Sequence, residues 1–181
     1  RLWQAVDRNN VMIKVPATEA GIPAVRQLIS EGLNINVTLM FSLAVYETVA
    51  ETYIAGLEDR AAQGFDLSGI NTVASFFISR IDTLVDDLLE KRAGEAVSDL
   101  EQEKIRDMLG QVAIANGTVT YQRYKELFTS ARWQKLADKG AKTQRVLWAS
   151  TSTKNPDYRD VLYVEELIGP DTINTLPDAT L

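Results

Sequence analysis

The stretch Asn10–Thr18, which reads Asn-Val-Met-Ile-Lys-Val-Pro-Ala-Thr, decides how the rest of the fold is interpreted. Alternating branched apolar residues across Val11–Val15 predict a short β-strand. Pro16 cannot donate to a strand ladder, so we expect the strand to end there, and Thr18 is a candidate N-cap for the helix that follows. Lys14 lies in the middle of this strand, on the face opposite its apolar side chains. A charged side chain there is costly unless it is paired, exposed or used chemically.

Four more strands are predicted along the chain. The clearest alternation in the sequence runs from Leu33 to Phe41 and places Asn36 and Thr38 on the same face. The other strands are expected at Ile70–Ile78, Arg145–Ser150 and Thr172–Leu176.

Helical segments are expected between these strands. Apolar spacing predicts one helix that follows Thr18 and ends at Gly32, and a long helix, Leu43–Gln63, that ends at Gly64. The charged stretch Asp82–Trp133 predicts two or three surface helices with breaks at Gly94 and Gly117, and a short helix is expected at Tyr158–Leu167. The chain opens on Arg1–Val6, which resembles the tail of an amphipathic helix, and no initiator methionine precedes it.

Strands that alternate with helices imply a parallel sheet, either doubly wound as in flavodoxin or part of a (β/α)8 barrel. In a doubly wound sheet the central strands are apolar on both faces, whereas Lys14 and the pair Asn36 and Thr38 give two strands here a polar face. The pattern therefore favours α/β architecture of the partial TIM-barrel type, with about five strand–helix units and extra surface helices. Five strands cannot close an eight-strand barrel, so residues 1–181 would form a single incomplete barrel domain.

Composition narrows the chemistry. A length of 181 residues, 45% of them apolar, is typical of a globular domain with a substantial core. The net charge of −6 argues against nonspecific nucleic-acid binding, which needs a dense basic surface. The sequence has no cysteine and no histidine, which excludes disulfides, thiolate nucleophiles, Ser-His triads and most transition-metal sites. Acid–base chemistry is left to carboxylates, lysine, tyrosine or water.

No signal peptide or membrane-spanning run is found, so a cytoplasmic location is expected.

Lys14 is the main catalytic candidate. A partly buried lysine whose pKa is lowered can attack a carbonyl carbon and form a Schiff base. The alternative is a structural lysine whose amine reaches solvent at the end of its strand. Asn36 and Thr38 point to one side, where they could bind substrate hydroxyls and hold a water molecule. The alternative is that they are ordinary polar residues of the strand without a functional role.

Anion-binding candidates follow two later strands. Ser75 and Arg80 lie near the end of the third expected strand, and an arginine suits a pair of phosphate oxygens. An ion pair between Arg80 and Asp82 is the alternative. Ser150 and Lys154 follow the fourth strand in a loop rich in hydroxyl groups. Together these residues describe a site for a phosphorylated carbonyl compound.

Four segments resemble transaldolase, in that family's order. These are Asn10–Thr18, Asn34–Ser42 (Asn-Ile-Asn-Val-Thr-Leu-Met-Phe-Ser), Ser75–Arg80 (Ser-Phe-Phe-Ile-Ser-Arg) and Val146–Ser150 (Val-Leu-Trp-Ala-Ser). The resemblance covers essentially the whole chain and is closest to the longer variants. It implies the C-terminal portion of the enzyme, barrel strands four to eight, so that residues 1–181 would lack the first three strands and the last helix of the barrel.

The resemblance implies a class I aldolase-type enzyme of the pentose phosphate pathway without a metal or organic cofactor. Lys14 would carry a dihydroxyacetone unit from sedoheptulose 7-phosphate to glyceraldehyde 3-phosphate, which gives erythrose 4-phosphate and fructose 6-phosphate. Sugar phosphates are the implied partners, with no nucleic acid or membrane, and no oligomeric state follows. The implied roles are a water-placing Thr38, a substrate-binding Asn36, phosphate ligands Arg80 and Ser150, and a channel lined by Ser75 and Phe77.

The sequence departs from the family pattern at several positions. Phe76 and Ser79 stand where the family has proline and glycine, and Ser150–Ser152 lacks the usual arginine, so Lys154 is the basic candidate. The family's proton-transfer aspartate and water-binding glutamate would precede Arg1. We therefore expect little or no turnover from the isolated chain. A different Schiff-base sugar-phosphate aldolase and a complete, non-catalytic, doubly wound binding module remain as alternatives.

Overall fold

A computed structural model describes residues 1–180. The chain divides into two compact units. The first comprises Arg1–Phe76 and Thr120–Leu147, and the second comprises Phe77–Val119 and Trp148–Leu181. Each unit is described by itself, and the prediction of one barrel domain over residues 1–181 stays a prediction.

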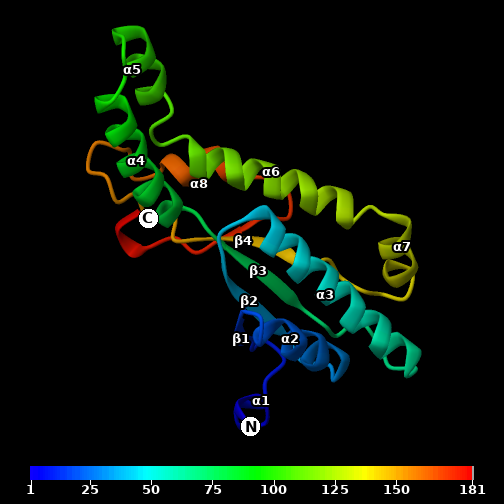
Figure 1. Ribbon diagram of the computed structural model, residues 1–181. Helices are drawn as coiled ribbons and strands as arrows, with labels where there is room; N and C mark the ends of the chain where they lie inside the picture. Colours follow the sequence, from blue (N-terminus) through cyan, green and yellow to red (C-terminus); the bar gives the residue numbers. More distant parts are fainter. Residues whose placement is uncertain (181) are drawn as a thin grey trace. The chain divides into compact units, whose positions relative to one another are not determined.

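The elements alternate along the chain as expected for an α/β protein (Figure 1). The strands are β1 (Ile13–Pro16), β2 (Ile35–Met40), β3 (Thr72–Phe77), β4 (Arg145–Ala149) and β5 (Ile173–Asn174). The helices are α1 (Leu2–Val6), α2 (Gly21–Ser30), α3 (Leu43–Ala62), α4 (Ser79–Gly94), α5 (Asp99–Arg106), α6 (Val112–Leu127), α7 (Ala131–Ala137) and α8 (Leu162–Leu167), with a 3-10 turn η1 (Asp178–Thr180). Within residues 1–180, none of these helices combines the length and apolar character needed to cross a membrane.

The strand order settles the choice between the two α/β architectures. The sheet has five strands in the order β1-β2-β3-β4-β5, and β1 with β2 and β2 with β3 pair in parallel. A doubly wound sheet needs a point where the strand order reverses, and this consecutive order has none. The prediction of an α/β fold is confirmed, and the consecutive winding is that of a (β/α)8 barrel.

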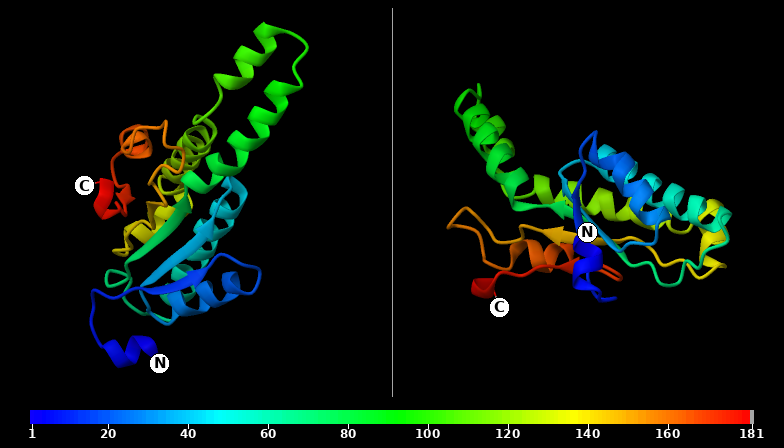
Figure 2. Two further views of the ribbon diagram at one scale, coloured as in Figure 1. Left: turned by 90° about the vertical axis from the view of Figure 1, so that its left-hand side faces the viewer. Right: turned by 90° about the horizontal axis from the view of Figure 1, so that it is seen from below.

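In the first unit, α2 and α3 lie on one side of β1 and β2 (Figures 1 and 2). The strand face toward them is apolar, and Ile35 and Val37 are fully buried. Val25 and Ile29 of α2 and a run of residues from Val49 to Leu57 of α3 complete this core. The two helices approach closely at Gly56, where an added Cβ would lie 2.8 Å from the Ile29 side chain and 2.9 Å from the Arg26 carbonyl oxygen. The opposite strand face carries the polar residues.

Several predicted boundaries are confirmed and others are wrong. Gly32 and Gly64 have left-handed φ angles of 94° and 79° directly after α2 and α3, as helix-ending glycines require. Gly117 does not break a helix. It lies inside α6 because the Leu167 side chain packs against it, 2.9 Å from the position of an added Cβ. The region Asp82–Trp133 holds parts of four helices rather than two or three.

Two later elements are shorter than predicted. The helix expected over Tyr158–Leu167 begins only at Leu162, because Tyr158 belongs to a turn whose N–H bonds to the Asn155 carbonyl oxygen. The final strand reduces to Ile173–Asn174.

At the start of the chain, Pro16 is included in β1. The ladder to β2 uses the N–H groups of Ile13 and Ala17, so the missing N–H of Pro16 is on the other edge. Thr18 does accept a hydrogen bond from the N–H of Gly21 (3.1 Å), although the N-cap residue itself is Ala20.

An ion-pair row connects α3 with α6 and α7 inside the first unit. Arg123 pairs with Glu47 at 2.6 Å, and Arg132 pairs with Glu58 at 2.7 Å and also with Glu51. Hydrogen bonds to Glu58, the largest influence, raise the pKa of the Arg132 guanidinium above its ordinary value.

We expect Arg132→Gln to lower the free energy of unfolding by about 0.5–1 kcal/mol, because half-exposed ion pairs are screened by water. The difference from the parent protein should shrink in about 1 M salt, where the screening length is only a few ångströms. Urea denaturation at low and high salt measures both. Lys135→Gln, one turn along on the same helix, is the control and should change neither value.

Candidate active site

Four of the predicted site residues come together on the polar strand face of the first unit. The parallel register places Lys14 beside Asn36 and Pro16 beside Thr38, so the strand alternation puts Lys14, Asn36 and Thr38 on one face. On the next strand, Ser75 donates a hydrogen bond from its hydroxyl to the Asn36 Oδ1 atom at 2.7 Å. Because its Oδ1 is engaged, the Asn36 amide is held in a fixed orientation next to the lysine.

Lys14 is exposed, and it lies on β1 at the end of the sheet. Its amine is therefore open to a ligand on the side of the sheet away from α2 and α3. This position differs from the partial burial expected from the sequence, because no further strand pairs with the outer edge of β1 within residues 1–180.

Thr38 is the most unusual polar group on this face. The residue is 6% exposed, and its hydroxyl oxygen is buried without a hydrogen-bond partner among the described residues. A buried hydroxyl is nearly always satisfied, so an orphan of this kind marks a place for a water molecule or a substrate atom.

A strand irregularity follows directly. The register between β2 and β3 shifts between Val37 and Met40, and Leu39 adopts a left-handed φ of 66°. Such bulges redirect side chains and are common next to functional sites. The bulge sends Leu39 outward and returns Met40 to the core, which corrects the simple alternation predicted through Leu39.

The second unit brings together the residues at the ends of β3 and β4. The Ser79 N–H donates to the Ser150 carbonyl oxygen at 2.9 Å, and the two hydroxyl oxygens lie 3.0 Å apart. Ser150 has a left-handed φ of 56°. The Arg80 guanidinium carbon lies 5.0 Å from the centre of the Phe77 ring, a cation–π contact that leaves Arg80 exposed at the start of the 16-residue helix α4. A helix start and an arginine favour an anion here.

The alternative partner for Arg80 is not used. The Asp82 carboxylate instead accepts hydrogen bonds from the Ala113 N–H at 2.7 Å and the Tyr163 hydroxyl at 2.8 Å, and burial raises its pKa. Arg80 is therefore available to a ligand within this unit.

Lys154 bonds to a serine other than the pair formed by Ser79 and Ser150. Its amine donates to the Ser152 hydroxyl at 2.7 Å, and the residue lines a cavity of about 260 Å³ together with Asp86 and Asp87. Its role as a phosphate ligand stays a prediction.

Sequence reasoning missed two parts of this region. Ser79 was treated only as a departure from a glycine, although a serine at a strand end beside Ser150 is well placed to bind an oxygen. The charged faces of the helices in Asp82–Trp133 are predicted to be solvated, Asp86 among them, and Asp82 is considered only as a partner of Arg80. Their spacing of four residues nevertheless places both aspartates on one helix face. That spacing was the available signal. Their tyrosine partners, the half-buried Tyr158 and the buried Tyr163, are far away in sequence.

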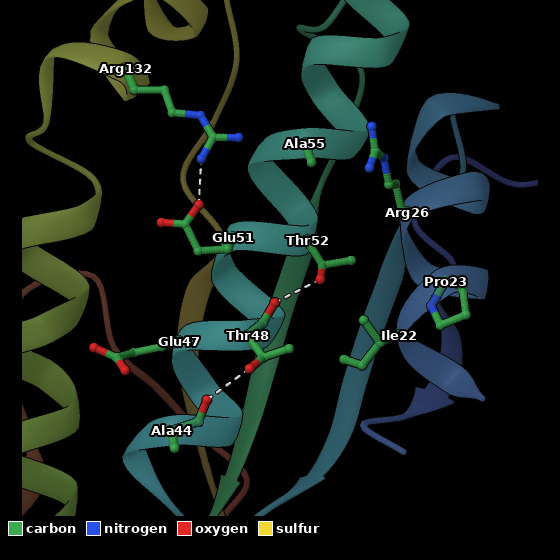
Figure 3. Close-up of a pocket in the computed structure, with 10 residues that line it drawn as sticks. All are labelled: Ile22, Pro23, Arg26, Ala44, Glu47, Thr48, Glu51, Thr52, Ala55 and Arg132. Atoms are coloured by element: carbon green, nitrogen blue, oxygen red, sulfur yellow. Dashed lines mark hydrogen bonds and ion pairs between the residues drawn. The ribbon is translucent and has the colours of Figure 1, made fainter. Parts of the chain in front are cut away.

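A larger cavity, about 830 Å³, lies elsewhere, between α2 and α3 (Figure 3). Its charged groups are already paired, Arg26 with Asp59 at 2.6 Å and Arg132 with Glu51. Thr48 and Thr52 donate their hydroxyl hydrogens to carbonyl oxygens of their own helix. The polar groups of this cavity are thus satisfied, and it holds none of the predicted site residues.

The fold and the site define a class of protein, a singly wound α/β protein with a lysine among polar side chains on the strand face away from the helices. Comparison with known proteins makes the assignment specific. The model of the transaldolase/fructose-6-phosphate aldolase family matches residues 1–181. The chain belongs to this family, whose fold is the (β/α)8 barrel.

Individual relatives agree with the family match. The chain is 56% identical over 182 residues to transaldolase 2 of Nostoc sp., covering 100% of this chain and 48% of the relative. It is 52% identical over 181 residues to the transaldolase of Trichodesmium erythraeum, with the same coverage. The transaldolase of Saccharopolyspora erythraea is 48% identical over 180 residues, 99% of this chain and 46% of the relative. The chain spans about half the length of the curated relatives it matches.

Proposed function

We propose that the protein containing this chain is a transaldolase, with Lys14 as the residue that forms the Schiff base. The observation that carries the proposal is the arrangement on the polar face: Lys14 in register with Asn36, and Asn36 fixed by Ser75. Family membership supports the same chemistry.

The proposed reaction runs through the lysine amine. The neutral amine of Lys14 attacks the ketone carbon of a ketose phosphate, and loss of water gives an iminium. A base of the full-length protein takes the proton of the C4 hydroxyl, and the C3–C4 bond of the ketose breaks to release an aldose phosphate. The electrons of that bond move toward the iminium and leave a three-carbon enamine on Lys14. The enamine attacks the aldehyde of a second aldose phosphate, and water then hydrolyses the new iminium and frees the lysine.

The other residues fit supporting roles in this scheme. Thr38 offers its unpaired hydroxyl to the water that adds to the iminium, and Asn36 and Ser75 bind the hydroxyls of the three-carbon unit. In the second unit, Arg80 and Ser150 are proposed phosphate ligands, and Phe77 a channel residue. Sugar phosphates are thus the proposed partners, sedoheptulose 7-phosphate and glyceraldehyde 3-phosphate among them, and the cytoplasm the proposed compartment.

Borohydride trapping tests this proposal. The full-length protein is mixed with fructose 6-phosphate, reduced with borohydride, digested and mapped by mass spectrometry. We expect a stable secondary amine on Lys14 alone. An adduct on a different lysine, or no adduct at all, would reject the assignment.

The acceptor requirement separates transaldolase from an aldolase of the same family. A transaldolase should form its second sugar phosphate only when an aldose phosphate acceptor is present. Release of free dihydroxyacetone at a comparable rate without acceptor would favour the aldolase. The purified 181-residue chain should show little or no turnover in either assay.

Thr38→Val provides a test of the orphan hydroxyl. Removing an unsatisfied buried hydroxyl should leave the free energy of unfolding unchanged or raise it by about 1 kcal/mol. The transfer rate should fall by about 10-fold or more, because the placed water loses its partner. Thr52→Val is the matched control, since its hydroxyl only bonds to Thr48 within α3, and it should keep full activity. Parallel loss of stability and activity in Thr38→Val would mean that the hydroxyl is structural.

A further inference from the structure

Two aspartates on α4 form equivalent clamps in the second unit. Asp82 and Asp86 are four residues apart, so they lie on the same helix face. Each carboxylate accepts one hydrogen bond from a backbone N–H and one from a tyrosine hydroxyl, and we call each of these two sets of contacts a clamp. For Asp86 the donors are the Gly110 N–H at 3.0 Å and the Tyr158 hydroxyl at 2.8 Å.

The clamps differ in what they hold. Tyr163 is the partner of Asp82 and lies in α8, where it is 1% exposed. Tyr158, the partner of Asp86, lies at the end of the hydroxyl-rich loop that begins at Ser150. The Tyr158 ring packs directly on Gly110, where an added Cβ would lie 2.9 Å from the ring.

The loop from Ser150 to Tyr158 is therefore held to α4 at two points. At its start, Ser150 bonds to Ser79 through both backbone and hydroxyl groups. At its end, Tyr158 bonds to Asp86, which is seven residues, or about two helical turns, after Ser79. The segment between these two points carries Ser152 and Lys154.

Asp86 also shares a small cavity, of about 260 Å³, with the loop's own cation, Lys154. While Tyr158 donates to Asp86, this carboxylate has a neutral hydrogen-bond partner. Without that hydroxyl, Asp86 would compete with a phosphate for the Lys154 ammonium, because a carboxylate that has lost a hydrogen bond binds another donor within reach.

We propose that the hydrogen bond from Tyr158 to Asp86 is a positioning contact for phosphate recognition. It holds the Ser150–Lys154 loop in place on α4 and keeps the Lys154 amine, which bonds to Ser152, from turning to Asp86, so that it can also bind a phosphate monoester. This inference rests on the proposed function for the identity of the anion. Tyr158 and Asp86 act through the loop and do not touch the substrate.

The test compares two tyrosine variants in the full-length protein, with inorganic phosphate as the probe. Tyr158→Phe keeps the ring against Gly110 and removes only the hydroxyl that holds the loop. Tyr163→Phe makes the same chemical change in the neighbouring clamp, outside the loop. The dissociation constant for phosphate is measured by ³¹P NMR titration, and the melting temperature is measured alongside.

We expect Tyr158→Phe to weaken phosphate binding about 5- to 10-fold, less than the full effect of a lost hydrogen bond to a charged group, because the loop is still held at Ser150. Tyr163→Phe should lower the melting temperature and leave the dissociation constant within about twofold. In steady-state assays, Tyr158→Phe should raise the KM for the phosphorylated ketose and leave kcat nearly unchanged.

Three results would overturn the proposal: an unchanged phosphate constant in Tyr158→Phe, an equal weakening in both variants, or no phosphate binding by the parent protein. The phosphate titration does not depend on Schiff-base chemistry. A missing borohydride adduct on Lys14 with the predicted phosphate constants would therefore reject the proposed function and leave the positioning contact standing.

Discussion

Replacement of Lys14 by methionine is expected to abolish both borohydride trapping and sugar transfer, with a loss in rate of at least about 1000-fold. Methionine matches the length of the lysine stem and removes the nucleophilic amine. Because Lys14 is exposed in this unit, the free energy of unfolding should change by no more than about 0.5 kcal/mol. Mass spectrometry of the reduced adduct and a coupled transfer assay measure the two effects.

Lys142→Met is the matched control for this variant. Lys142 is also exposed, and its amine donates to the Asn71 Oδ1 atom at 3.1 Å, just before β3 begins at Thr72. It should retain the adduct and full activity. Residual trapping in Lys14→Met above the level of a surface lysine would place the Schiff base elsewhere and contradict the proposed mechanism.

Substitution of Gly21 by alanine is expected to have the largest effect on stability. A Cβ at this first residue of α2 would lie 1.9 Å from the Pro16 carbonyl oxygen and 3.1 Å from the Thr18 hydroxyl. Backbone atoms cannot rotate away, so β1 or α2 must move. We expect a loss of about 2–3 kcal/mol in the free energy of unfolding, typical of overpacking. The movement would begin two residues from Lys14, so transfer activity should fall as well.

Gly94→Ala is the comparison for this effect. Gly94 is the last residue of α4, and no atom lies within 4 Å of its added Cβ. Alanine should be neutral there or stabilising by up to about 1 kcal/mol, because it is the better helix former. Urea denaturation of both variants gives the two values. An equal free energy of unfolding for Gly21→Ala and its parent would contradict this prediction, because it would show that the β1–α2 turn can move to accommodate the added Cβ at little cost.

The main strands could be predicted because their side-chain pattern has a period of two and their faces have different environments. Asn36 and Thr38 were identified in this way, and the strand register confirms that they share a face with Lys14. The bulge at Leu39 could not be predicted, since a leucine with positive φ has no sequence signature.

Helix boundaries in the charged region depend on contacts that are remote in sequence. Gly117 resembles a helix break, yet it is retained inside α6 because Leu167 needs the space that a side chain would occupy. The same holds for the aspartates of α4. Their environment is set by Tyr158 and Tyr163, which lie 72 and 81 residues further along the chain. Spacing within one helix reveals a shared face but not what covers it.

The outer edge of β1 bears on how this polypeptide behaves at high concentration. Strand edges with unpaired peptide groups recruit other chains and start aggregates. Here the ladder to β2 uses the N–H groups of Ile13 and Ala17, so Lys14 and Pro16 are the residues turned to the outer edge. Proline has no N–H to offer, and the lysine charge repels a second copy of the same edge. Within residues 1–180, the residue proposed for catalysis and the nearby proline thus make this edge a poor partner for a second copy of the chain.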